Sequence, residues 1–153
     1  MVPRLVAALA CGIALVAGCT ARQGDPRAYP DSRDESLDRT LARFSLDLPD
    51  CDLHDFRYFA TDDLQGAFFF RATVPASCAE GYLARLGMST DLGAKTGVSF
   101  IGTYEKDRFG WRYTEPEPCP CYQRYVSADV QVSLNIADDG GDKTLYLRAI
   151  RHT

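Results

Sequence analysis

Apolar and polar residues alternate over a long stretch near the C-terminal end of the chain, residues 126–136. The apolar members are Val126, Ala128, Val130, Val132, Leu134 and Ile136, and the polar members between them are Ser127, Asp129, Gln131, Ser133 and Asn135. Because successive side chains of a strand point to opposite faces, this pattern predicts a half-buried strand with its apolar residues inward and its polar residues outward. The Asp- and Gly-rich residues 138–142 predict a hairpin turn, and residues 143–150 a returning strand.

Aromatic and β-branched residues indicate further strands in the middle of the chain. Residues 56–61 and 67–74 are rich in them, and the polar sequence 62–66 has the composition of a turn. The consecutive residues Phe68, Phe69 and Phe70 predict a strand that contacts apolar surface on both faces. By the same criteria, residues 98–104 predict a strand, residues 105–108 a charged turn, and residues 111–114 a strand returning beside it.

One segment has the pattern of an amphipathic helix. Its apolar stripe consists of Ala79, Tyr82, Leu83 and Leu86. Pro75 stands where a helix can begin, and Gly87 follows its predicted end. The spacing of Leu37, Leu41 and Phe44 predicts a shorter helix over residues 36–43. A helix placed among hairpins predicts an α+β domain, an antiparallel sheet with one main helix (about 76–86) packed on one face. The order of the strands stays open.

The N-terminal residues have the pattern of an export signal. One positive charge at Arg4 precedes the apolar residues 5–17, a run well short of the ~20 residues that a membrane-spanning helix needs. The run ends on Val16-Ala17-Gly18-Cys19, which resembles the lipobox of bacterial lipoproteins. The resemblance implies cleavage before Cys19, lipidation of its thiol, and anchoring of the mature protein to the cell membrane on the extracytoplasmic side. An ordinary secretory signal is the alternative.

Composition divides the rest of the chain. Residues 1–18 are the predicted signal peptide. Residues 19–36 contain Gly24, Pro26, Pro30 and several charges without apolar periodicity, which predicts a flexible tether behind the lipid. Residues 37–153 then form one globular domain of common size. The Ala-, Arg-, Gly- and Asp-rich usage also resembles that of small lipoproteins from actinomycetes.

Four cysteines follow Cys19, and an even number in an exported chain predicts two disulfides. They are Cys51, Cys78, Cys119 and Cys121. We favour pairing Cys51 with Cys78, which would tie the start of the domain to the main helix, and Cys119 with Cys121 across Pro120. If that short ring is too strained, Cys119 and Cys121 would each pair with one of the other two.

Few residues of the chain suit catalysis or metal binding. The only histidines are His54 and His152, and neither has further metal ligands at suitable spacing. We also find no nucleophile motif and no phosphate loop in the sequence. The sequence therefore predicts a non-enzymatic protein without cofactor or metal. A net charge of −4 without a basic stripe also argues against a nucleic-acid partner.

The aromatic residues between positions 104 and 125 suggest a binding face. The candidates are Tyr104, Trp111, Tyr113, Tyr122 and Tyr125, with arginines among them. Such residues bind proteins and sugars, so we predict an anchored binding protein with an envelope protein or a glycan as partner. The alternative for the aromatic residues is packing in the core. The alternative function is a thiol–disulfide redox factor that uses Cys119 and Cys121.

Overall fold

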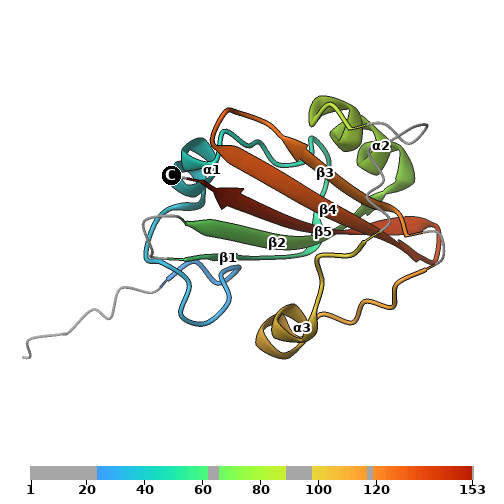
Figure 1. Cartoon of the computed structure of the whole chain (residues 1–153). Coiled ribbons are helices and arrows are strands. Elements are labelled where there is room, and N and C mark those ends of the chain that lie inside the picture. Colours follow the sequence, from blue (N-terminus) through green and yellow to red (C-terminus); the bar gives the residue numbers. More distant parts are fainter. Residues whose placement is uncertain (1–23, 62–65, 89–97, 117–118, 153) are drawn as a thin grey trace, which may run out of the picture.

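The fold is a five-stranded antiparallel sheet with helices on both of its sides (Figure 1). The computed structural model describes residues 24–61, 66–88, 98–116 and 119–152. The strands are β1 (His54–Ala60), β2 (Ala67–Pro75), β3 (Cys121–Tyr125), β4 (Val130–Asp139) and β5 (Asp142–Arg151), in the order β1-β2-β5-β4-β3. The helices are α1 (Leu37–Arg43), α2 (Ala76–Arg85) and α3 (Thr103–Phe109). The predicted α+β class is confirmed.

The main core lies between the sheet and the helices α1 and α2. Every second residue of β2, β4 and β5 points into it, including Phe70, Leu134 and Leu147, none of which has measurable solvent exposure. Tyr82 and Leu83 of α2 pack against these strands. Burying the apolar faces of the strands against the helices is the main source of stability in such a layered domain.

Helix α2 and its disulfide agree with the sequence prediction. Pro75 precedes the first turn, and Gly87 follows the helix with a φ of 66°, which glycine adopts without steric cost. The N–H groups of Gly87 and Met88 donate to the carbonyl oxygens of Ala84 and Leu83, the Schellman arrangement that ends a helix. Cys51 and Cys78 are paired with their Cα atoms 6.4 Å apart, which confirms the favoured bridge.

The prediction of strands at 98–104 and 111–114, with a charged turn at 105–108, is wrong. Residues 103–109 form α3, and residues 111–114 lie in no strand. The Glu105 carboxylate accepts a hydrogen bond from the Gly102 N–H at 2.9 Å, and Gly110 follows the helix with a φ of 64°. These helix-end signals outweigh the β-propensity of the aromatic residues.

The predicted strand at 126–136 is correct only in part. β4 begins at Val130, and the N–H of Val126 donates to the Val130 carbonyl in the turn from β3, a strand that we did not predict. Ser133 and Asn135 are buried rather than exposed. The reason is that residues 98–116 cover the face of the sheet opposite α1 and α2, which we call the second face. Phe109, Trp111 and other aromatic residues form this cover.

We predicted that the domain starts at Leu37, but the packed part of the chain begins upstream of this residue. The N–H of Tyr29 donates to the Tyr58 carbonyl at 2.7 Å, and the Tyr58 N–H donates to the Arg27 carbonyl at 3.0 Å. β1 is an edge strand, so its outer backbone groups are open to this pairing. The predicted tether is therefore wrong for these residues.

The predicted signal peptide and Cys19 lie outside the described residues. Of the helices in the described part of the chain, none has the length and apolar character needed to cross a membrane.

Candidate binding site

The structure does not bring the five predicted aromatic residues together on one face. Trp111 and Tyr113 are buried on the second face of the sheet, and Tyr122 is buried on the face that carries α2. Only Tyr104 and Tyr125, which are 56% and 54% exposed, are open to solvent. They lie on different elements, α3 and β3. A continuous aromatic binding face is therefore wrong, and packing is the role of three of its members.

The buried aromatic residues connect the covering segment to the sheet. The indole N–H of Trp111 donates to the Tyr29 hydroxyl at 3.0 Å, and the rings of Tyr113 and Tyr146 are 5.4 Å apart. The exposed Tyr125 ring lies 5.8 Å from the ring of His152. These contacts explain why the sequence concentrates aromatic residues here without forming a surface patch.

Cys119 and Cys121 lie in a closed environment. They are paired, with Cα atoms 5.2 Å apart, and both are at most 5% exposed. The Tyr113 hydroxyl contacts the two sulfur atoms at 3.4 and 3.7 Å, and burial raises its pKa, so it is protonated at neutral pH. A carboxylate oxygen of Glu115 lies within 4.8 Å of the sulfurs. Sulfur atoms bonded to each other are not thiolate ligands, so this group does not favour a metal centre.

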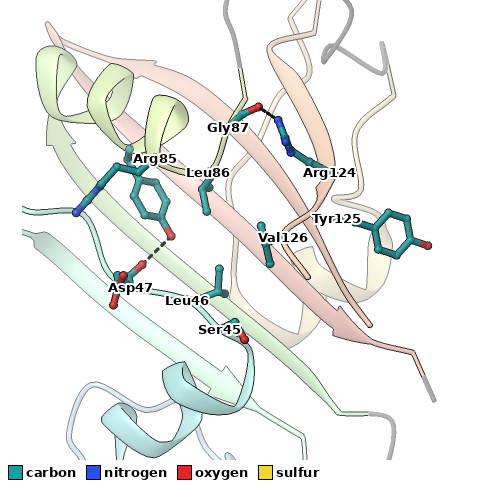
Figure 2. A pocket seen from close by; sticks show the side chains of 10 residues that line it. Ser45, Leu46, Asp47, Arg85, Leu86, Gly87, Arg124, Tyr125 and Val126 are labelled. Carbon is teal, nitrogen blue, oxygen red and sulfur yellow. Dashed lines mark hydrogen bonds between the residues drawn. The ribbon is translucent and has the colours of Figure 1, made fainter. Parts of the chain in front are cut away.

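A pocket of about 300 Å³ opens between α2, the chain after α1, and β3 (Figure 2). We call it the α2 pocket; its lining residues are Ser45, Leu46, Asp47, Tyr82, Arg85, Leu86, Gly87, Arg124, Tyr125 and Val126. Figure 2 shows the side chains of Leu46, Leu86 and Val126 pointing toward one another as an apolar floor. Tyr125 is among the lining residues, but its ring points away from this floor.

The polar side chains at the rim are held by hydrogen bonds to the backbone. The Tyr82 hydroxyl donates to the Asp47 carbonyl at 3.0 Å, and burial raises its pKa. Arg85 donates to the Leu48 carbonyl at 3.1 Å, and its guanidinium lies 5.5 Å from the centroid of the Tyr82 ring. Arg124 donates to the Gly87 carbonyl. The rim is thus ordered before any ligand arrives.

Two helix ends build this pocket. α2 ends at Arg85 with Leu86 as its C-cap, and α1 ends at Arg43 with Phe44 as its C-cap. The N–H of Leu46 then donates to the Leu41 carbonyl at 3.0 Å. Ser45 between them has a φ of 53°, a conformation that residues other than glycine adopt at a cost of about 1 kcal/mol. Carbonyl groups concentrate at helix C-termini and attract cations, which accounts for the placement of Arg85 and Arg124.

Sequence reasoning did not find the α2 pocket. Gly87 marked the end of a helix, but its neighbours Leu46 and Arg124 come from segments about 40 residues away on either side. Only the tertiary fold brings these three segments together. No protein family, curated protein or solved structure matches the chain, so the function is argued from its own residues.

Proposed function

We propose that the protein is a lipid-anchored domain of the cell envelope that binds another envelope protein without catalysis. The lipobox-like sequence that ends at Cys19 supports the anchor and the extracytoplasmic location. The Cys51–Cys78 disulfide supports the same location, because such bridges form and persist in oxidising compartments.

The observation that carries the binding function is an apolar floor inside a preorganised polar rim. Leu46, Leu86 and Val126 face an open space large enough for a bulky side chain. Protein interfaces commonly insert an apolar or aromatic anchor into such a pocket, surrounded by arginine and tyrosine. We therefore assign the α2 pocket to an apolar side chain of a protein partner.

A glycan partner has less support. Sugar-binding sites present an aromatic ring as a platform, whereas the Tyr125 ring points away from the floor of the α2 pocket. The redox alternative also has less support. Thiol–disulfide exchange requires the thiolate of another molecule to reach one of the two sulfur atoms. Cys119 and Cys121 are 5% and 1% exposed.

The anchor is tested by the intact mass of the protein purified from its own host. We expect the mass of residues 19–153 plus acyl chains, and extraction from membranes only with detergent. The Cys19→Ser variant is the control, and we expect it to leave the membrane fraction. A wild-type mass without acyl chains would contradict the anchor and leave plain secretion.

The binding function is tested by photo-crosslinking in the host. A crosslinking residue replaces Ser45 at the α2 pocket or, as a control, the exposed Asp107 on α3. We expect a discrete protein adduct from position 45 only, and its loss when Val126→Lys places a charge in the floor. Equal adducts from both positions, or an adduct that survives Val126→Lys, would contradict binding in the α2 pocket.

A further inference from the structure

A second pocket, of about 270 Å³, lies on the opposite face of the sheet from the α2 pocket. We call it the Arg148 pocket. Polar side chains of β3, β4 and β5 line it together with the chain just before α3. The lining includes Ser99, Phe100, Gln123, Ser133, Asn135 and Arg148. Neither Asp nor Glu is among its described lining residues. Arg148 is the one charged residue among the described lining residues, and both polar and apolar side chains surround it.

The charge of Arg148 is not compensated by a partner. Its guanidinium lies 4.9 Å from the centroid of the Phe100 ring, and its Nε is buried without a hydrogen-bond acceptor. Over the described ranges, the side chain makes neither an ion pair nor a hydrogen bond. Burial lowers its pKa, opposed only by the more distant charge of Glu105. Since a partly desolvated cation without an acceptor is costly, the guanidinium of Arg148 favours an anion.

Glu105 does not fill this role. One of its carboxylate oxygens accepts the Gly102 N–H at 2.9 Å at the start of α3. It is therefore engaged in capping the start of α3, and it does not line the Arg148 pocket. An anion that forms hydrogen bonds with Arg148 would therefore come from outside the described chain.

Ser99 supplies a second donor. Its Oγ accepts one hydrogen bond from the Ile101 N–H at 3.0 Å and another from the side-chain amide of Asn135. A hydroxyl has two acceptor positions and one hydrogen. Both acceptor positions of Ser99 Oγ are occupied, which leaves its hydrogen available to donate. This hydrogen has no acceptor among the described residues. Ser133 and Gln123 add further polar groups to the lining.

We propose that the Arg148 pocket binds the carboxylate of a small organic molecule. One guanidinium balances one negative charge and can hold a carboxylate through two parallel N–H···O bonds. A phosphate group carries close to two negative charges, and the described lining residues include no second cation to balance them. Phe100 provides an apolar wall for the body of the ligand. This proposal is independent of the α2 pocket and of the membrane anchor.

The test is NMR of arginine Nε–H groups in the mature protein purified from its host. Sodium acetate, benzoate and phosphate are each titrated against sodium chloride at equal ionic strength. We expect a saturable shift of the Arg148 Nε–H resonance with acetate and benzoate only. Since a charge-assisted hydrogen bond contributes about 1.5–3 kcal/mol, Arg148→Gln should weaken benzoate binding by roughly 10-fold or more, measured by calorimetry.

Two variants separate binding from folding. Ser99→Ala retains Arg148, and we expect it to weaken benzoate binding several-fold while the Arg148 resonance still responds. Arg39→Gln removes an exposed guanidinium on α1 and should leave benzoate binding unchanged. The same non-saturating shift with chloride and carboxylates would overturn the site, as would equal benzoate binding by Arg148→Gln. Saturable binding of phosphate alone would overturn the assignment to a carboxylate.

Discussion

The two faces of the sheet bury different kinds of side chain. The face under α1 and α2 is a continuous apolar core in which strand residues such as Phe68, Val132 and Leu145 lie fully buried under helices. The other face holds a smaller aromatic group with buried polar residues beside it, among them Asn135 and Thr144. Its cover is one short helix flanked by chain without regular structure.

Because of this difference, one face of the sheet supplies most of the apolar core, and the other face holds most of the buried polar groups. An apolar face packed under helices excludes water from the strand residues that it buries. The second face keeps hydroxyl, amide and guanidinium groups under an irregular cover, and the Arg148 pocket lies there. The guanidinium of Arg148, which has no hydrogen-bond or ion-pair partner among the described residues, is therefore on the face that contributes less to the apolar core.

The adjacent residues Phe69 and Phe70 test the two faces directly, because one points to each and both are buried. We expect Phe70→Ala to cost about 3–5 kcal/mol of unfolding free energy, since helices enclose the cavity it leaves. Phe69→Ala should cost less, because the irregular cover can settle into the space. Denaturant titration of both variants measures this, and an equal or larger loss for Phe69→Ala would remove the distinction.

The Cys51–Cys78 bridge should matter next most, because it belongs to the α2 face. The disulfide closes a loop with a sequence separation of 27 residues, so the chain-entropy estimate gives roughly 3.5 kcal/mol. We expect the double Cys51→Ser, Cys78→Ser variant to lose about this much in denaturant unfolding. A loss below about 1 kcal/mol would show that the bridge adds little to the packing of α2.

A hydroxyl pair tests the polar character of the second face. The Oγ1 atoms of Thr73 and Thr144, both buried, are 3.1 Å apart. We expect Thr144→Val to cost about 1–2 kcal/mol, because it leaves the Thr73 hydroxyl without this partner. The double Thr73→Val, Thr144→Val variant should cost less than the sum of the single variants, as measured by a double-mutant cycle. Strict additivity would mean that the two hydroxyls do not interact.

The smallest effect is expected at the edge of the sheet. Arg27 lowers the pKa of Asp25 to about 2 through a hydrogen-bonded ion pair. A lowered carboxyl pKa stabilises the packed state above the ordinary value near 4, and this contribution is lost as the pH falls toward 2. We expect the protection of the Tyr29 N–H from hydrogen exchange to fall over this range. In Asp25→Asn this protection should be lower and should not change with pH there; a wild-type response in that variant would assign the effect to another group.

Local signals in the sequence were sufficient for several elements. The apolar stripe of α2 with Pro75 and Gly87 at its ends, the hairpin turn at 138–142, and the Cys51–Cys78 pairing all follow the prediction. Each depends on residues close in the chain or on the known preference of exported cysteines to pair. The α+β class follows from the order of these elements.

Other features depended on contacts between distant segments. The alternation in 126–136 could not show that Ser133 and Asn135 would be covered, because residues 98–116 provide the cover. The same cover buries Trp111 and Tyr113, which sequence reasoning placed on a binding face. A sequence rich in aromatic residues looks the same whether those residues pack in a core or bind a partner. Only their neighbours in space distinguish the two roles.

What the sequence by itself determined is therefore the set of helical and hairpin elements, the α2 face and one disulfide, since periodicity, end signals and cysteine count are local properties. The tertiary structure alone decided the strand order, the second layer and both pockets. Leu46 meets Val126 in one pocket, and Ser99 lies with Arg148 in the other, through long-range packing. Burial and hydrogen-bond partners are properties of neighbours in space, and these neighbours are distant in the chain.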